Sequence, residues 1–323
     1  MKKESINTFL DQRNIPYEED VSIMSKSWIK RGGIASFWVQ PIEMSQMKEF
    51  VKWLQKESIS FEVVGNTSNT YFLNSYNPLV VISTLKLKKF QIADGVIVCD
   101  CGCNMIRLSK YCIENRIAGY EGFIGLPGTV GGAAINNSGC YNSLTSDLIK
   151  EVSIIEQGEE KILTRDQLKY AHRTSVLKRK EIDAVLLTVS FDISKQEDSS
   201  ILKNRATEFQ QHRISYSEHK YPNLGTAFCQ LDIKYSLMQQ VLKKMHTLVL
   251  LLFIKKEKRM PFHTRFILQI FPETSEFRSY ISDCGMQCFV WKDNGADNAF
   301  VKYMEFIRNR ANSFVLEIDI KEK

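Results

Sequence analysis

The chain has 323 residues, of which 44% are hydrophobic, 25% charged and 11% aromatic, which is ordinary for a globular protein and too apolar for a disordered one. The length favours two domains. The net charge of +6 is small and no arginine-rich stripe with interleaved aromatics appears, which argues against a nucleic-acid-binding protein. Glycine is scarce, at 16 residues, yet seven of them fall between Gly119 and Gly139.

The N-terminal sequence MKKESINTFLDQRN has no apolar core, so we expect no secretory signal and a cytoplasmic protein. The eight cysteines are then expected to be reduced. The longest apolar run, Leu248 to Ile254, is too short to span a membrane, which takes about 20 residues. We therefore predict no membrane insertion.

The first part of the chain mixes helical and strand patterns. Apolar residues recur at helical spacing over 42–57 and 105–117. Short apolar or β-branched runs predict strands. These strands are expected at 61–65, 78–84, 95–101 and 183–193, together with a hairpin over 151–164 that turns at Gly158.

Polar residues 194–200 lack periodicity and are the best linker candidate. Three helices and a closing strand are predicted beyond it. The helices are expected at 201–213, 234–246 and 296–313, and the strand at 314–320. Because helices and strands do not alternate regularly, the pattern favours an α+β fold on both sides of the linker.

Two groups of residues have an ordinary interpretation. Cys99, Cys101 and Cys103 would share one face of a strand, but they lack Cys or His partners at zinc spacing, so we expect buried thiols and no metal site. The basic run formed by Lys255, Lys256, Lys258 and Arg259 is expected to be a solvated helix end or loop.

One short loop is a candidate phosphate site. Gly65, Asn66, Thr67, Ser68 and Asn69 directly follow a predicted strand. Small residues allow successive backbone amides to turn toward an anion, and the side chains add donors. No GxGxxG or GxxxxGK[ST] pattern is present, so neither a Rossmann fold nor a P-loop is supported.

The glycine-rich segment Gly119–Tyr141 is the most specific feature. Bare backbone would let a large planar ligand approach closely. Pro127 stiffens the segment, and Thr129, Asn136 and Asn137 supply donors. The glycines placed to do this are Gly125, Gly128, Gly131 and Gly132.

The sequence GLPGTVGGAAINNSGCY resembles the signature of the UDP-N-acetylenolpyruvoylglucosamine reductases, also called UDP-N-acetylmuramate dehydrogenases, and GNTSN resembles the GxGSN loop of that family. The resemblance implies an α+β FAD-binding domain of the vanillyl-alcohol-oxidase (PCMH) type over 1–195, with subdomains of about 1–84 and 85–195. A smaller α+β substrate-binding domain is then expected over 201–323. The cofactor would be non-covalent FAD, because Ser68 and Asn69 stand where flavinylated relatives carry a histidine.

By the same resemblance, Gly65, Asn66, Thr67, Ser68 and Asn69 would hold the FAD pyrophosphate. A second set would line the flavin and its phosphates. It comprises Gly125, Pro127, Gly128, Thr129, Gly131, Gly132 and Asn136.

The family uses NADPH to reduce the enolpyruvyl ether of a UDP-N-acetylglucosamine derivative to UDP-N-acetylmuramate, a precursor of cell-wall peptidoglycan. The partners implied are therefore this nucleotide sugar and NADPH. Hydride addition builds negative charge on the substrate carboxylate, which a nearby cation would stabilise. Arg173, in a segment similar to Tyr-Arg-x-Ser, is the candidate cation. Thr226 replaces the serine that protonates the substrate in Asn-x-Gly-Ser-x-Phe, and Glu317 matches the first acid of Leu-Glu-x-Glu.

Some positions depart from the family. His172 stands in place of a tyrosine, and Cys229-Gln230-Leu231 stands where the family has Lys-Asn-Pro. Residues 231–284 match poorly. Two alternatives therefore remain: a paralogue acting on another nucleotide-sugar or surface-polysaccharide intermediate, or an FAD-binding protein that has lost catalysis.

Overall fold

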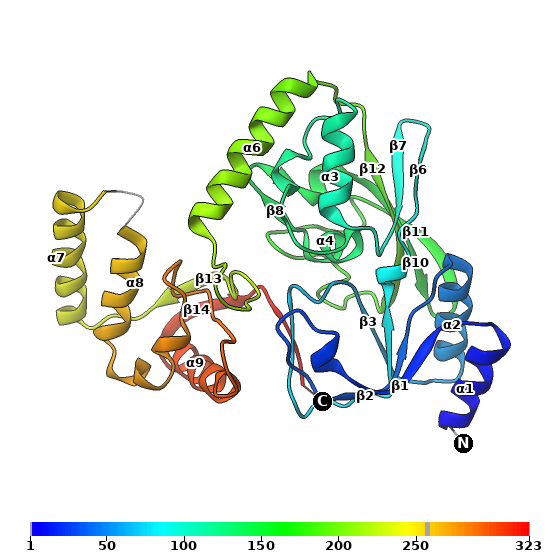
Figure 1. Ribbon diagram of the computed structural model, residues 1–323, viewed down its shortest axis with the longest axis horizontal. Helices are drawn as coiled ribbons and strands as arrows, with labels where there is room; N and C mark the ends of the chain where they lie inside the picture. Colours follow the sequence, from blue (N-terminus) through cyan, green and yellow to red (C-terminus); the bar gives the residue numbers. More distant parts are fainter. Residues whose placement is uncertain (1, 256–258, 323) are drawn as a thin grey trace.

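The structure is a computed structural model that describes residues 2–255 and 259–322. Two sheets and their helices form the larger part, and a smaller unit extends to one side (Figure 1). The first sheet has the strand order β1-β2-β5-β3, with β1 antiparallel to β2 and the other neighbours parallel. Its strands and helices are β1 (Tyr17–Ser22), β2 (Ile34–Val39), β3 (Phe61–Val64), β5 (Val80–Ser83), α1 (Lys2–Gln12) and α2 (Met44–Lys56), with the short turns η1 (Ile23–Ser25) and η2 (Thr84–Lys86).

The second sheet is antiparallel throughout, with the order β11-β10-β12-β7-β6. Gln157 and Gly158 both have positive φ between β10 and β11, the conformation that a tight hairpin favours. The elements of this part are β6 (Phe90–Ala93), β7 (Val96–Asp100), α3 (Met105–Glu114), η3 (Glu121–Phe123), α4 (Val130–Asn136), β8 (Gly139–Cys140), β9 (Ser143–Leu144), α5 (Thr145–Leu148), β10 (Ile149–Glu156), β11 (Glu159–Thr164) and β12 (Ala184–Asp192).

One hydrophobic core joins the two sheets. It contains α2 residues such as Phe50 and Leu54 together with Val152 and Phe191 of the second sheet. The long helix α6 (Ser199–Tyr216) packs Leu202 and Ala206 against Ile113 and Ile124, and so lies along the outside of α3 (Figure 1).

The C-terminal unit has its own core, in which Phe228, Phe277 and Tyr303 are buried. It is built on the antiparallel pair β13–β14. Its elements are β13 (Phe228–Ile233), α7 (Leu237–Phe253), α8 (Arg259–Gln269), η5 (Pro272–Glu276), η6 (Arg278–Tyr280), α9 (Ala296–Arg310) and β14 (Ala311–Leu316).

The chain then returns to the larger part. β15 (Asp319–Lys321) pairs in parallel with β4 (Thr70–Phe72), and Tyr71 packs in the C-terminal core. The guanidinium of buried Arg31 lies 3.2 Å from Asp297 of α9, which also accepts a hydrogen bond from the Tyr71 hydroxyl. The two units are thus joined through both strand pairing and buried polar contacts.

The predicted α+β class is confirmed, and most of the predicted elements occur near the expected positions. Two predictions are wrong. The strand expected at 314–320 is two strands in different sheets, separated at Glu317 and Ile318, and the helix expected to end at residue 246 continues to Phe253. Propensity alone does not mark the break in the strand, because β14 pairs with β13 and β15 pairs with β4.

The cysteine and basic-run predictions are corrected in part. β7 ends at Asp100, so only Cys99 lies on the strand, and Cys101 and Cys103 are buried in the turn that follows. In the basic run, Lys255 is exposed and Arg259 begins α8, whereas Lys256 and Lys258 lie outside the described residues. None of the described helices has the length and apolar character needed to cross a bilayer.

Candidate active site

The two loops singled out from the sequence are in contact. The Ser68 hydroxyl donates a hydrogen bond to the carbonyl oxygen of Pro127 at 3.0 Å. A Cβ atom on Gly65 would lie 2.4 Å from Oγ1 of Thr129, which is closer than atoms can approach. Glycine at position 65 therefore allows the loop after β3 to touch the loop before α4.

The start of α4 rests on the end of β7. Thr129 caps the helix, and its hydroxyl accepts a hydrogen bond from the Gly132 amide at 3.2 Å. The Gly131 amide donates to the carbonyl oxygen of Cys101 at 2.8 Å, and a Cβ on Gly131 would lie 2.9 Å from that oxygen. The cluster of glycines thus serves close packing as well as access to the backbone.

A cavity of about 1240 Å³ opens beside these loops. It is larger than the roughly 300–1,000 Å³ of common small-molecule pockets, which suits a dinucleotide. Its lining combines glycine backbone with amide, hydroxyl, ammonium and carboxylate groups. The lining includes Gly65, Asn69, Thr129, Gly132, Asn136 and Lys178.

Other predicted cofactor residues support these loops. The Thr67 hydroxyl accepts a hydrogen bond from the Trp28 amide at 2.8 Å, which holds the first loop against the segment after β1. Asn66, Gly125, Pro127 and Gly128 are half-buried around the contact. Asn137, expected to supply a donor, is buried and donates to the carbonyl oxygen of Ala171 at 2.9 Å.

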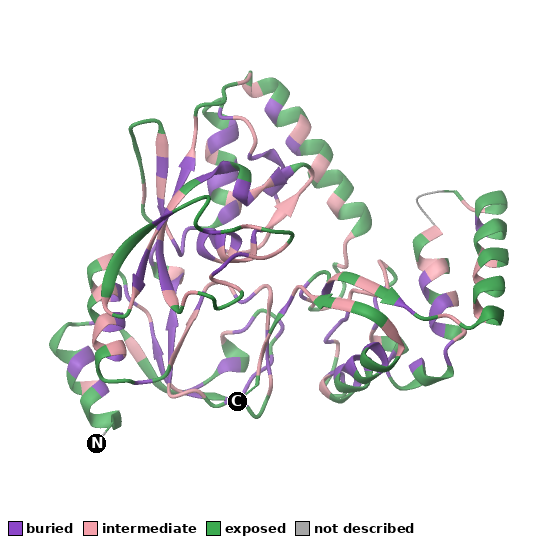
Figure 2. Ribbon diagram, turned by 180° about the vertical axis from the view of Figure 1, so that it is seen from behind, coloured by how far each residue is buried: buried purple, intermediate pink, exposed green. Residues whose placement is uncertain are grey.

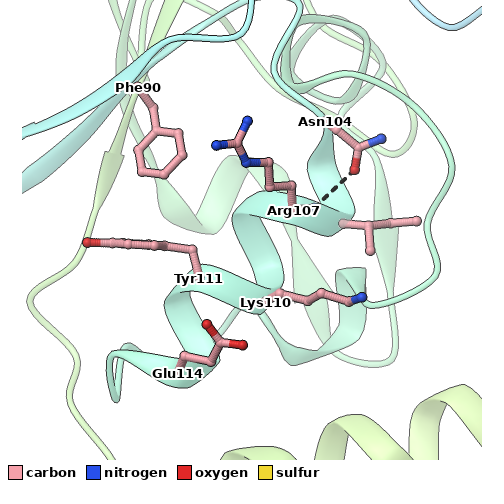
Figure 3. A pocket seen from close by; sticks show the side chains of 7 residues that line it. Phe90, Asn104, Arg107, Lys110, Tyr111 and Glu114 are labelled. Atoms are coloured by element: carbon pink, nitrogen blue, oxygen red, sulfur yellow. Dashed lines mark hydrogen bonds between the residues drawn. The ribbon is translucent and has the colours of Figure 1, made fainter.

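A smaller cavity of about 470 Å³ lies on the outer side of α3. In Figure 3, Arg107 extends toward the ring of Phe90, and the Asn104 side chain accepts a hydrogen bond from the Arg107 amide. These polar groups serve the helix itself, and the predicted loop residues do not line this cavity. The larger cavity is therefore the candidate cofactor site.

Arg173 and Glu317, 144 positions apart in the sequence, form an ion pair. Nε of Arg173 lies 3.1 Å from Oε1 of Glu317, and both side chains are about three-quarters buried. Arg173 has a positive φ of 58° within the tight turn that Ala171 and Thr174 close. The structure thus joins two of the three predicted catalytic residues.

The backbone of Glu317 connects three parts of the site. Its amide donates to the carbonyl oxygen of Ala227 at 2.8 Å. Its carbonyl oxygen accepts hydrogen bonds from the Asn69 amide and from the Lys178 ammonium, each at 2.9 Å. Asn69 belongs to the first loop, and Ala227 follows the third predicted catalytic residue. Glu317 is therefore where the cofactor loop and the C-terminal unit meet.

Thr226 is exposed at this junction. The preceding residue, Gly225, has a φ of 74°, in the left-handed region. Asn223 and Gly225 form an Asx turn, in which Oδ1 of Asn223 accepts a hydrogen bond from the Gly225 amide at 2.9 Å. The carbonyl oxygen of Asn223 accepts a hydrogen bond from the Trp28 indole at 3.0 Å. The turn that carries Thr226 is thus fixed to the same segment as the first loop.

Lys178 is a functional candidate that the sequence did not single out. Burial lowers the pKa of its ammonium, and the carboxylates of Glu317 and Asp319 oppose that shift. Ser175 aids its placement, because the Ser175 hydroxyl donates to the carbonyl oxygen of Ile135 and accepts the Lys178 amide. In the sequence, the one feature that could have indicated a role for Lys178 is its position five residues after Arg173.

Arg213 of α6 was missed as well. One of its terminal nitrogens lies 2.9 Å from Sγ of Cys140, and its Cδ lies beside Gly125. Burial raises the pKa of the Cys140 thiol, while the nearby Arg213 and Arg173 oppose this. Two guanidinium groups therefore flank Cys140 at the end of the glycine-rich segment.

Comparison with known proteins connects these features to a family. The model of a family described as "FAD binding domain" matches residues 35–164, which confirms the predicted FAD-binding domain. In the described residues, no group of three or more His, Cys, Asp or Glu side chains could hold a metal ion.

The curated relatives include the UDP-N-acetylenolpyruvoylglucosamine reductases of Caldicellulosiruptor saccharolyticus and Clostridium kluyveri. The first is 27% identical over 220 residues, which is 68% of this chain and 71% of the relative. The second is 28% identical over 225 residues, covering 69% and 72% of the two chains. A crystal structure of the Thermus caldophilus reductase of the same name superposes with a TM-score of 0.67 at 17% identity, covering 95% of this chain and 99% of that one.

Proposed function

Since the chain is related to the UDP-N-acetylenolpyruvoylglucosamine reductases over two thirds of its length and has the fold of one, we propose that it is an FAD-dependent oxidoreductase with that activity. The reaction consumes NADPH and a proton and saturates the enolpyruvyl double bond, giving UDP-N-acetylmuramate. The observation that carries the proposal is the junction at Glu317, where Arg173, the first loop and the segment of Thr226 meet.

FAD fits the larger cavity. The two glycine loops present bare backbone, and the Thr129, Asn69 and Asn136 side chains add polar groups around it. When bound, the flavin would carry two electrons from NADPH to the substrate. The lining residues would hold and orient it without a covalent bond, and the hydrogen bond from the Asn69 side-chain amide to the Glu317 carbonyl oxygen keeps the first loop in place.

Arg173 is the candidate for binding the substrate carboxylate. The Glu317 carboxylate pairs with Nε of the Arg173 guanidinium. The Nη1 atom of the guanidinium lies beside Gly139, 3.6 Å from the position that a Cβ atom on that glycine would occupy. The remaining N–H donors suit the planar carboxylate of an enolpyruvyl group. Glu317 thus positions Arg173, and the cation stabilises the negative charge that hydride addition builds.

Thr226 is the candidate proton donor to the carbon next to the carboxylate. A threonine hydroxyl can donate a proton as a serine does, while its extra methyl group restricts χ1. The positive charges of Arg213 and Lys178 suit the diphosphate and carboxylate of a nucleotide-sugar substrate. Because NADPH and nucleotide sugars are cytoplasmic metabolites, this proposal places the reaction in the cytoplasm.

The first test measures flavin and turnover. Purified protein should retain flavin absorbance through gel filtration and release FAD on heating. It should then oxidise NADPH only when the enolpyruvyl derivative of UDP-N-acetylglucosamine is present. Bound FAD without substrate-dependent turnover would instead favour a paralogue with another nucleotide-sugar substrate or a protein that has lost catalysis.

The second test addresses Thr226. Thr226→Ala should leave flavin reduction by NADPH nearly unchanged and slow flavin reoxidation by the substrate by about 10²–10⁴-fold, the range expected for loss of a general acid. Thr8→Ala, at an exposed position of α1, is the matched control and should leave both steps intact. An equal loss in both half-reactions would contradict the assignment of Thr226 as the proton donor.

A further inference from the structure

The helices α7 and α8 form a hairpin that projects from the body of the protein. They lie between β13 and η5 at one end of the long axis of the molecule, and the front and back views agree on this (Figures 1 and 2). Figure 2 shows α7 as exposed along nearly its whole length. The hairpin lies outside the junction at Glu317, so its features need an explanation beyond the proposed reaction.

One face of α7 is apolar and faces solvent. At about 100° per residue, nine apolar side chains fall within an arc of about 160°. Each of them is at least 40% exposed. We call this set the apolar stripe, and it consists of Leu237, Met238, Val241, Leu242, Met245, Leu248, Val249, Leu252 and Phe253.

A different face of α7 packs on the hairpin. The His246 ring stacks on Phe266 of α8, with centroids 3.9 Å apart. Gln239 donates a hydrogen bond to the carbonyl oxygen of Ile270, and Leu250 is the buried residue of the helix. The apolar stripe is therefore not what holds the hairpin together. Exposed apolar surface that is continuous on one helix face marks an interaction site.

The hairpin region also concentrates the positive charge of the chain. The described residues from the end of β13 to the start of η5, 234–255 and 259–271, contain six Lys or Arg and no Asp or Glu. Their net charge of +6 equals that of the whole chain, so the charges of all other residues sum to zero. Lys244 and Lys255 are exposed on and just after α7.

The charge distinguishes between possible occupants of the apolar stripe. Two copies of the hairpin would bring two +6 regions together, which is unfavourable. An anionic lipid surface offers both an apolar layer for the stripe and negative headgroups for the lysines. The helix has 17 residues, or about 25 Å, and does not qualify as a spanning segment, so it would lie in the plane of the surface.

We propose that the α7–α8 hairpin is a membrane-docking element that inserts its apolar stripe into the surface of an anionic bilayer. The inference goes beyond the reductase activity and does not depend on it. The docking is peripheral, and it leaves the cavity and the Arg173–Glu317 pair on the body of the protein.

Vesicle co-sedimentation of the full-length protein tests the proposal. Binding should be strong to vesicles of equal parts phosphatidylglycerol and phosphatidylcholine, and weak to phosphatidylcholine alone. The triple variant Met245→Gln, Leu248→Gln, Leu252→Gln should lower the affinity for anionic vesicles at least tenfold. Replacing three exposed apolar side chains in this way should not disturb the core.

A second variant and a matched control sharpen the result. Lys244→Gln with Lys255→Gln should weaken binding by about fivefold per lysine and reduce its salt sensitivity. Ile92→Gln with Ile162→Gln, two exposed apolar positions on β6 and β11, should bind like the wild type. Retained flavin and unchanged circular dichroism would show that each variant is folded. If the triple variant does not fold, the vesicle binding of the lysine variant tests the proposal.

Two results would overturn the proposal. The first is absence of binding to the anionic vesicles, and the second is equal binding to both vesicle types. If binding is absent and the triple variant converts an oligomer in gel filtration to a monomer, the occupant of the apolar stripe is a second copy of the chain.

Discussion

The contact between Gly65 and Thr129 allows a quantitative test of the site. In Gly65→Ala, the new Cβ would lie 2.4 Å from Thr129 Oγ1, about 1 Å inside the 3.4 Å at which ordinary contact begins. Either the two loops separate or the threonine rotates and no longer caps α4. Overpacking costs about 1–3 kcal/mol and loss of the cap about 1 kcal/mol, so either response should lower the free energy of unfolding by about 1–3 kcal/mol.

Thermal unfolding and flavin retention after gel filtration measure the effect. Gly65→Ala should lower the Tm by several degrees and release part of the FAD. In the double variant Gly65→Ala, Thr129→Ala, the clashing oxygen is gone, and the cost should be close to that of Thr129→Ala alone, about 1 kcal/mol.

Gly95→Ala is the matched control. Gly95 has a φ of 74°, and its Cβ would meet no atom within 4 Å, so the substitution should cost about 1–2 kcal/mol through the backbone alone and leave FAD bound. If the double variant were less stable than Gly65→Ala by the full cost of Thr129→Ala, the contact would not explain the need for glycine at position 65.

Two further predictions concern charge and burial. Burial lowers the pKa of Lys178, so turnover should begin to fall at a pH below the ordinary lysine range as the ammonium loses its proton. Lys178→Arg should abolish this alkaline decline, because arginine keeps its charge. If the pH profiles of the wild type and the variant were identical, Lys178 would not belong to the site. Burial also raises the pKa of the Cys101 and Cys112 thiols to about 12, so iodoacetamide at pH 8 should label them only after unfolding. The half-buried Cys229 and Cys284 should react in the native protein. Labelling of Cys101 at the native rate of Cys229 would contradict the buried turn.

The sequence by itself determined the elements and the cofactor loops. The α2 and α3 helices follow from apolar spacing, and the β10–β11 hairpin from a glycine between two β-branched runs. The segments around Gly65 and Thr129 carry glycine and donors that indicate a large planar ligand with a phosphate, and their resemblance to two loops of a known family implied FAD, which the FAD-binding-domain match confirms. Such patterns are local, so a single sequence displays them.

Only the tertiary structure brought the catalytic candidates together. Arg173 and Glu317 are 144 positions apart, and the sequence placed Glu317 on one strand with Asp319. Glu317 instead lies at the break between β14 and β15, because β14 pairs within the C-terminal unit while β15 pairs with β4 of the larger part. Lys178 becomes a candidate only through the carbonyl oxygen of Glu317.

The same limit applies to the region after β13. The apolar spacing of α7 predicts a helix but cannot say whether its apolar face is buried, because any partner helix would produce the same pattern. In the structure α8 packs on His246, which lies on a different face of α7, and the apolar stripe remains open to solvent. Local chemistry fixed where the elements and the cofactor loops are, while long-range packing decided which residues share the site and which apolar surface remains exposed.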